Sequence, residues 1–279
     1  MRVPLLTLLA ILAFAANSIL CRLALGDESI DAASFAALRL GSGTVVLLVL
    51  LGLRGQRPAG GWLPGLALFL YMVPFSFAYV SLSAGTGALI LFGAVQATMI
   101  LSALQAGERL HGKEWCGLLI ACGGLVYLVW PGVRAPSPAG SGLMAVAGVA
   151  WGIYSLRGRL AEAPMAATAG SFLRALPFAL IVSLLCLRAA HLTLRGASLA
   201  VLSGAVTSGL GYVIWYAAIA GLTATRAATA QLAVPALTTM GGVALLGEPL
   251  TVRLVLASVL ILGGVALAMT HRPSGGAGS

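Results

Sequence analysis

The fold is decided by residues 222–270, which read LTATRAATAQLAVPALTTMGGVALLGEPLTVRLVLASVLILGGVALAMT. This stretch consists of two apolar runs separated once, by the sequence G-E-P-L at 247–250. The same pattern occurs 140 positions earlier, with a G-E-x-L break at 107–110. Seven identical residues fall in register: Leu82, Thr98, Gly107, Glu108, Leu110, Gly123 and Gly124 match Leu222, Thr238, Gly247, Glu248, Leu250, Gly263 and Gly264. The chain therefore contains an internal repeat of half its length.

The earlier segments repeat with small drifts in offset. Phe14 matches Trp151 at an offset of 137, and Arg39 matches Arg174 at an offset of 135. We predict two copies of one unit, residues 1–135 and 136–270. The Gly/Ser-rich residues 271–279 are expected to form a disordered tail.

The composition indicates a membrane protein. Hydrophobic residues make up 60% and charged residues 8% of the chain, and the mean hydropathy is +1.04. Soluble domains contain about 25% charged residues. Runs of about 20 apolar residues are long enough to cross a bilayer, and such spans must be helical because lipid cannot pair exposed backbone groups. We expect an all-α membrane protein with ten transmembrane helices, near 4–25, 32–53, 62–82, 84–105, 113–130, 140–160, 167–187, 197–219, 222–245 and 250–270.

The basic residues predict the orientation in the membrane. With the N-terminus inside, nine basic residues fall in cytoplasmic segments and four in outer segments. The positive-inside rule then places both termini in the cytoplasm of a multi-pass protein of the inner (plasma) membrane. The net charge of +9 is mostly this topology signal, and the absence of a basic stripe outside the spans argues against a nucleic-acid partner.

Five spans per copy would turn the second copy upside down relative to the first. Inverted-topology repeats are typical of secondary transporters, which bind substrate near the membrane midplane between the repeats. Residues 1–25 also have features of a cleavable signal peptide, but their repeat partner at 141–160 favours a first span.

Several motifs, each present in order, resemble the EamA family of the drug/metabolite transporter (DMT) superfamily. They are the G-E-x-L break followed by Gly-Gly, the Leu-Arg opening of the second span, Trp151-Gly152 and Ala233-Val234-Pro235. The resemblance covers residues 4–270 and implies two inverted five-helix repeats that export small metabolites. Within the family the chain looks closest to amino-acid exporters, including those for aromatic amino acids. The first copy departs from the pattern, with Phe14-Ala15 for Trp-Gly and Val95 opposite Pro235.

Aromatic residues inside the spans are candidates for the wall of a substrate cavity. Trp151 and Tyr154 share one helix face, and Tyr212, Trp215 and Tyr216 form a similar stripe. Aromatic stripes at matching depth in two spans favour a pocket wall whose Tyr hydroxyl and Trp N–H groups can form hydrogen bonds. Core packing or contact with lipid is an equally favoured interpretation of these residues. Tyr79, one turn beyond Pro74, is a further candidate.

Three amides lie inside predicted spans, where polar side chains usually face the bundle interior: Asn17, Gln96 and Gln231. For Asn17 and Gln96, a helix–helix hydrogen bond and substrate contact are equal alternatives. For Gln231 we favour substrate contact, because Pro235 would free its carbonyl to hold an ammonium group.

Charged residues near span ends are interpreted as structural. Arg39 and Arg174 lie about two turns into their spans, so each is expected to snorkel or to pair with backbone carbonyls, and a role at the mouth of a cavity is the alternative. Glu108 and Glu248 precede helices and would stabilise the positive ends of those helices. All seven acidic residues lie in loops or at helix ends, so we expect no proton coupling through a carboxylate buried at mid-membrane.

The sequence therefore predicts an exporter of small polar metabolites, with amino acids as the expected substrates and alternating access as the mechanism. Other solutes, such as drugs or sugar conjugates, are the alternative. A membrane-embedded enzyme is disfavoured, because no catalytic or metal-binding motif occurs and all three histidines lie in loops or tails. We expect no cofactor, no metal and no catalytic residue. The partners are the bilayer and a small-molecule substrate, and a monomer is compatible with this architecture.

Overall fold

The structure, a computed structural model, describes residues 2–105, 112–132, 135–158, 161–219, 222 and 230–269. Within these ranges the chain is helical, and no strand occurs beyond an isolated bridge between Ile30 and Leu192. The predicted tail at 271–279 and the first G-E-x-L break at 107–110 lie outside the described residues.

Each predicted span contains a described helix. The first half comprises α1 (Arg2–Gly26), α2 (Ala32–Leu53), α3 (Trp62–Tyr79), α4 (Ala84–Gln105) and α5 (Gly112–Val129). The second half comprises α6 (Pro138–Gly158), α7 (Pro164–Leu185), the continuous segment α8 (Leu194–Leu202), η2 (Ser203–Leu210) and α9 (Gly211–Ile219), then α11 (Ala233–Leu246) and α12 (Val252–Met269). Eight of these helices are long and apolar enough to cross a membrane, and α11 and α12 are shorter apolar helices. The protein is thus an all-helical membrane protein.

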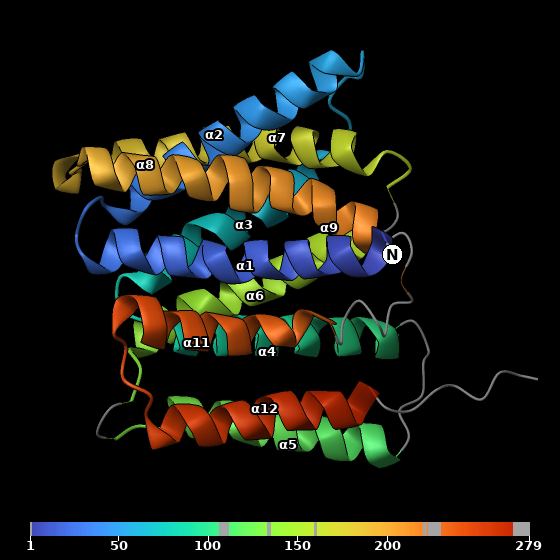
Figure 1. The fold of residues 1–279 in the computed structure, drawn as a ribbon, viewed down its shortest axis with the longest axis vertical. Helices are drawn as coiled ribbons and strands as arrows, with labels where there is room; N and C mark the ends of the chain where they lie inside the picture. The colour runs from blue at the N-terminus through green and yellow to red at the C-terminus, as the bar shows by residue number, and fades with distance from the viewer. Residues whose placement is uncertain are drawn as a thin grey trace, which may run out of the picture.

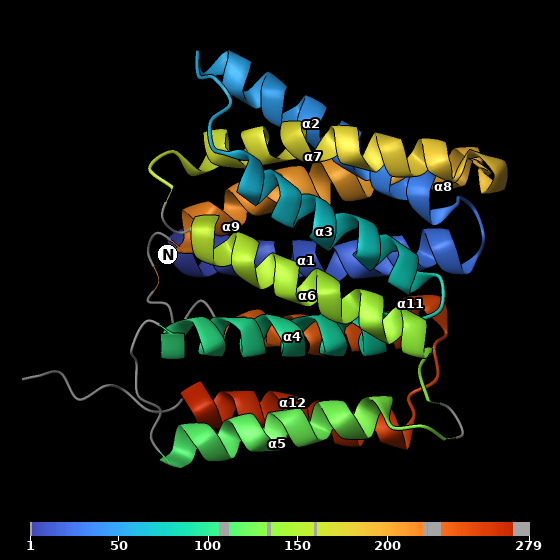
Figure 2. The ribbon, with the colours of Figure 1, turned by 180° about the vertical axis from the view of Figure 1, so that it is seen from behind.

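The helices lie roughly side by side in one bundle (Figure 1). The pair α5 and α12 forms one edge, and α2, α7 and α8 form the other (Figures 1 and 2). Between them, α1, α3, α6 and α9 occupy the centre. The start of α1 and the end of α12 lie at the same end of the bundle, called here the N-terminal end. The far end carries the connections α1–α2, α3–α4 and α11–α12.

The repeated Gly-Gly pairs explain how α5 and α12 pack closely. A Cβ atom on Gly264 would lie 2.6 Å from the Ala121 nitrogen and the Gly117 oxygen, and one on Gly124 would lie 2.8 Å from the Leu260 Cβ. The second glycine of each pair therefore lies in the contact between the two helices, and small residues there let the backbones approach. The first glycine of each pair, Gly123 or Gly263, meets no neighbour.

The far end is tied together between the halves. The Asp31 carboxylate caps α2 by accepting from the Ser34 backbone nitrogen (2.9 Å), and it also accepts from the His191 backbone nitrogen (3.1 Å). The Thr193 hydroxyl donates to the Ser29 carbonyl at 2.7 Å. These bonds fix the α1–α2 connection against the segment that precedes α8.

Candidate functional site

Aromatic rings fill the centre of the bundle. Trp151 of α6 lies among four other rings, with centroid distances of 5.7 Å to Phe14, 4.9 Å to Tyr71, 5.6 Å to Tyr154 and 5.0 Å to Tyr212. The pairs are edge-on or tilted, the arrangements that aromatic quadrupoles favour. We define the aromatic cluster as Trp151, the four rings that it contacts and the rings that contact those four; its members are Phe14, Tyr71, Phe75, Trp151, Tyr154, Phe172, Tyr212 and Trp215.

The aromatic cluster joins helices from both halves of the chain. Phe14 is on α1, Tyr71 on α3, Trp151 on α6 and Tyr212 on α9. A void of about 10 Å³ lies against it, with Asn17 and Leu91 among the other lining residues. A space of that size is about enough for one water molecule. The central cavity expected from the sequence is therefore closed in this conformation.

Asn17 connects α1 to an unusual segment of the eighth span. Its side-chain oxygen accepts hydrogen bonds from Ser203 (2.7 Å) and Thr207 (3.1 Å). Both hydroxyls belong to η2, a π-helix of eight residues. Such widened turns inside α-helices are frequent at functional sites. This segment carries three buried hydroxyls toward the centre, and no feature of the sequence predicted it.

Arg39 differs from the prediction. Its side chain is fully buried (0% exposed) and does not snorkel. Its Nε donates to the Ser208 hydroxyl (3.0 Å) and one terminal nitrogen donates to the Tyr71 hydroxyl (3.3 Å). The guanidinium carbon lies 4.9 Å from the ring centroid of Phe75. The expectation of a snorkelling or carbonyl-paired anchor is wrong here, because hydroxyls and rings from α3 and η2 enclose the group.

The repeat counterpart Arg174 behaves as predicted. It donates to the backbone carbonyls of Gly170 (2.9 Å) and Ala59 (3.3 Å). Its guanidinium carbon lies 6.0 Å from the ring centroid of Trp62. Arg174 therefore anchors the α2–α3 connection to α7 at the N-terminal end.

The structure brings together five of the eight predicted site residues and leaves three elsewhere. Trp151, Tyr154, Tyr212 and Trp215 belong to the aromatic cluster, and Asn17 lines the same void. The other three are Tyr79, Gln96 and Gln231. Sequence reasoning missed Tyr71, Phe75 and Phe172. Tyr71 and Phe75 stand four residues apart around Pro74, a helical spacing that could have revealed them.

Tyr79 is one ring away from the cluster, at 4.8 Å from Phe75, and its hydroxyl donates to the Ala84 carbonyl (3.3 Å). Gln96 is buried and faces a different void, of about 20 Å³, whose lining includes Leu118 of α5 and Val265 of α12. Neither side-chain polar atom of Gln96 has a hydrogen-bond partner among the described residues.

Gln231 is buried, and its side-chain oxygen has no hydrogen-bond partner among the described residues. The described helix α11 begins at Ala233, so Pro235 lies in its first turn. Residues 230 and 231 are also helical and Leu232 has helical φ and ψ, so helical backbone precedes α11. Pro235 has no N–H to donate to the Gln231 carbonyl, and the role of that carbonyl in holding an ammonium group stays a prediction.

Glu248 forms a polar clasp at the far end. Both of its carboxylate oxygens lie 2.9 Å from the Ala84 nitrogen at the start of α4, and one lies 3.3 Å from Arg22 Nε. A second Arg22 nitrogen donates to the carbonyls of Tyr79 and Val80. Glu248 thus stabilises a helix N-terminus, as predicted, but the helix is α4 of the other half. The following helix α12 is capped by Thr251, whose hydroxyl accepts from the Leu254 nitrogen (3.1 Å).

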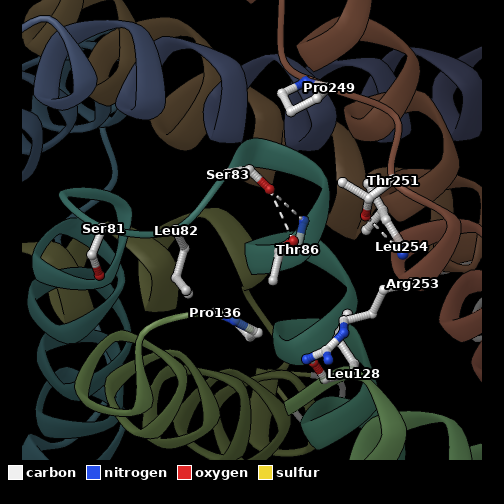
Figure 3. Close-up of a pocket in the computed structure, with 10 residues that line it drawn as sticks. All are labelled: Ser81, Leu82, Ser83, Thr86, Leu128, Pro136, Pro249, Thr251, Arg253 and Leu254. Atoms are coloured by element: carbon white, nitrogen blue, oxygen red, sulfur yellow. Dashed lines mark hydrogen bonds between the residues drawn. The ribbon is translucent and has the colours of Figure 1, made fainter. Parts of the chain in front are cut away.

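Two larger pockets lie at the ends of the bundle. The far-end pocket has a volume of about 390 Å³ and lies between the start of α4 and the start of α12, with Ser83, Thr86 and Arg253 on its wall (Figure 3). The N-terminal-end pocket, of about 150 Å³, is lined partly by Tyr154 and Tyr216. Tyr154 therefore connects this pocket to the aromatic cluster. Among the described residues no group of His, Cys, Asp and Glu side chains is arranged to hold a metal.

A helical membrane protein with a polar and aromatic centre shared by two halves has the architecture of a solute transporter. The EamA-like transporter family matches residues 1–130 and again 138–270 of this chain. The protein belongs to that family, a branch of the DMT superfamily, and so is a multi-pass membrane transporter of small solutes.

Two relatives and one protein of known structure are similar to this chain over most of its length. An uncharacterised protein of Pseudomonas aeruginosa is 53% identical over 275 residues, which cover 97% of this chain and 96% of that protein. An uncharacterised transporter of Archaeoglobus fulgidus is 28% identical over 208 residues, 73% of this chain and 74% of that protein. A protein of known crystal structure, 23% identical, shares the fold with a TM-score of 0.67 over 94% of this chain and 98% of its own.

Proposed function

We propose that this protein is a secondary transporter of the inner membrane that exports small polar metabolites, amino acids in particular, by alternating access. The observation that carries the proposal is the aromatic cluster, in which rings from both halves meet at the bundle centre. The N-terminal-end pocket reaches this centre at Tyr154, a second pocket lies at the far end, and the central void itself is closed. A closed centre between two end pockets is what an occluded stage of alternating access requires.

We further propose that residues 1–135 and 136–270 form two inverted five-helix repeats. The helix contacts support this, because they occur in matched pairs. If each helix is exchanged for its counterpart in the other half, the contact of α3 with α6 becomes that of α9 with α1. The contact of α4 with α6 likewise becomes that of α11 with α1. The contacts α2–α7, α4–α11 and α5–α12 map onto themselves, as a two-fold axis demands.

The basic residues favour a cytoplasmic N-terminal end. Among residues at that end, Arg54, Arg57 and Arg157 lie beside the α2–α3 and α6–α7 connections. Both termini would then be cytoplasmic. Glu248 and the far-end pocket would face the outside.

The lining of the centre favours an amino acid with an apolar or aromatic side chain. Phe14, Trp151 and Trp215 offer ring faces for such a group. The Asn17 amide and the Tyr212 hydroxyl offer hydrogen bonds to the polar part of the solute, and the Tyr212 hydroxyl faces that of Tyr71 without a well-formed hydrogen bond. Small-molecule sites are usually lined by apolar and aromatic side chains, with a few polar groups that fix the orientation of the ligand.

The test is counterflow in proteoliposomes. Vesicles preloaded with unlabelled solute are given the radiolabelled form of leucine, phenylalanine, lysine, a cationic dye or a nucleotide sugar. We expect leucine and phenylalanine to exchange, and Trp151→Ala to lower that exchange roughly tenfold, which corresponds to the loss of about 1.4 kcal/mol of contact with the solute. Trp62→Ala is the matched control, because Trp62 is 64% exposed at the start of α3. Exchange of the dye or nucleotide sugar without amino acids would overturn the substrate assignment.

A further inference from the structure

Arg39 is a buried cation whose neighbours are neutral. Of its three nitrogens, Nε and one terminal nitrogen donate to the hydroxyls of Ser208 and Tyr71. The other terminal nitrogen is buried and has no hydrogen-bond partner within the described part of the chain. The guanidinium group therefore has an unused donor at the centre of a membrane protein.

No described carboxylate offsets this charge. The ion pairs that the described residues form join Arg22 to Glu248 and Arg195 to Asp27, both at the far end. Burying a charge without a counter-ion is strongly unfavourable, and intramembrane charges therefore usually mark substrate or ion pathways. The contacts with the rings of Tyr71 and Phe75, at 5.4 and 4.9 Å, stabilise the cation only in part.

The same two rings lead from Arg39 to the centre. Tyr71 and Phe75 line the central void together with Phe14 and Trp151. The Tyr71 ring lies 4.9 Å from Trp151, and its hydroxyl accepts from Arg39. Release of that single hydrogen bond would leave both terminal nitrogens of Arg39 free to donate to a ligand.

The segment behind Arg39 is built for close approach. A Cβ atom on Gly204 of η2 would lie 2.1 Å from the Arg39 carbonyl oxygen, so only glycine permits this packing of η2 on α2. That packing brings Ser208, on the same π-helix, within 3.0 Å of Arg39 Nε. Ser208 thus holds Nε and fixes the plane of the guanidinium, while one terminal nitrogen has no hydrogen-bond partner among the described residues.

We propose that Arg39 binds the carboxylate of the transported solute, with its two terminal nitrogens donating to the two carboxylate oxygens. A planar guanidinium pairs with carboxylate in this two-bonded geometry, which a point charge cannot reproduce. The rest of the solute then lies among the rings of the aromatic cluster. This inference rests on the proposed transport function and narrows it to solutes that carry a free carboxylate.

The experiment compares L-phenylalanine with L-phenylalaninamide, in which a neutral amide replaces the carboxylate. Binding of each to the purified full-length protein is measured by thermal shift, and uptake is measured in proteoliposomes. The wild-type protein should bind phenylalanine roughly 10- to 100-fold more tightly than the amide, the usual range for hydrogen bonds to a charged group. In Arg39→Met this preference should vanish, and in Arg39→Lys it should be intermediate. Arg174→Met, the repeat counterpart at the N-terminal end, should keep the preference.

The outcomes separate this inference from the proposed function. If phenylalanine and its amide are bound and transported equally by the wild-type protein, the carboxylate assignment is overturned while the transport function stands. An Arg39→Met protein that keeps the wild-type preference also overturns it. If Arg39→Met does not fold, the wild-type comparison and Arg39→Lys still decide the question. If neither compound, nor any other amino acid, binds or exchanges, both proposals fall.

Discussion

Replacing Glu248 should open the far end of the bundle. Glu248 links three helices. Its carboxylate accepts from the Ala84 nitrogen at the start of α4 and pairs with Arg22 of α1. Its backbone follows α11 directly, after a turn in which Gly247 has a φ of +65°. The Glu248 side chain is 13% exposed and that of Arg22 is 26% exposed. In Glu248→Gln the shape and one acceptor for Ala84 remain, but the charge is lost.

The magnitude follows from these contacts. A hydrogen bond to a charged group contributes about 1.5–3 kcal/mol. The side-chain amide of Glu248→Gln can still accept from the Ala84 nitrogen, but as a neutral acceptor it contributes only about 0.5–1.5 kcal/mol. Loss of the favourable charge at a helix N-terminus adds about 0.3–1 kcal/mol. The ion pair with Arg22 is partly exposed, and Arg22 keeps its two carbonyl acceptors, so its loss contributes at most about 1 kcal/mol. The charge at the α4 N-terminus acts through the same contact with Ala84, so these contributions overlap and do not simply add. We expect Glu248→Gln to destabilise the closed far end by about 1–2 kcal/mol, a change of roughly 5- to 30-fold in its equilibrium.

The assay is thiol labelling of Ser18→Cys, placed in a protein whose four native cysteines have been replaced. Ser18 is buried (2% exposed) on α1, one turn before Arg22, and lines the central void. A membrane-impermeant reagent added from outside should label it roughly 5- to 30-fold faster when Glu248→Gln is also present.

Exchanging the charges provides a control. Arg22→Glu combined with Glu248→Arg should not restore closure, because an arginine at position 248 would oppose the positive end of α4. Labelling rates equal to those of the parent protein in Glu248→Gln would show that the clasp does not hold the far end closed.

Three other predictions concern stability and coupling. Gly264→Leu should lower the free energy of unfolding by about 1–3 kcal/mol, because the new side chain must displace the α5 backbone. Gly263→Leu should leave the free energy of unfolding nearly unchanged, because a Cβ atom at Gly263 meets no neighbour. Equal melting temperatures for the two variants in detergent would contradict the α5–α12 contact. Partial burial opposes ionisation of Asp31, but hydrogen bonds from Ser34 and His191 outweigh it and lower the pKa of this carboxyl. The ionised Asp31 carboxylate therefore stabilises the fold above the ordinary aspartate pKa, and this stabilisation is lost as the pH falls through the lowered pKa. The variant Asp31→Asn should make the melting temperature depend less on pH in the acidic range. If the melting temperature of this variant falls with acid as steeply as that of the wild type, Asp31 does not have this role. Finally, a pH gradient imposed on vesicles with clamped membrane potential should drive no net accumulation of leucine, and accumulation abolished by a protonophore would refute the absence of proton coupling.

The helices could be predicted from the sequence because long apolar runs in a bilayer have one solution. Predicted and observed ends differ by about three residues or fewer, except at the start of α11. The π-helix η2 could not be predicted in this way. Ser203–Leu210 has ordinary helix-forming composition for a membrane span, and its widened turn depends on the contacts of Gly204 with α2 and of Thr207 with Asn17. Those contacts join residues more than 150 positions apart, which periodicity within one span does not reveal.

The candidate site was predictable where one helix face carried the signal. Trp151 with Tyr154, and Tyr212 with Trp215, are stripes three residues apart, and both stripes reach the centre. The environment of Arg39 was predicted wrongly because the depth of a residue along a helix does not determine the direction in which its side chain points. A side chain two turns into a span reaches either the interface or the interior, depending on the helix that covers it.

The proposed two-fold axis gives the contrast between the two arginines a functional meaning. Phe14 and Trp151 are repeat counterparts, and their rings lie 5.7 Å apart at the centre, so the axis relating the halves would pass between them. A site on that axis made from identical halves would present the same groups in two opposite directions, which does not suit a solute with one carboxylate. The divergence of Phe14 from Trp151 and of the buried Arg39 from the anchoring Arg174 removes this equivalence. The proposed inverted scaffold would then supply two similar ends, while the residues that differ between the repeats would give the solute a single orientation.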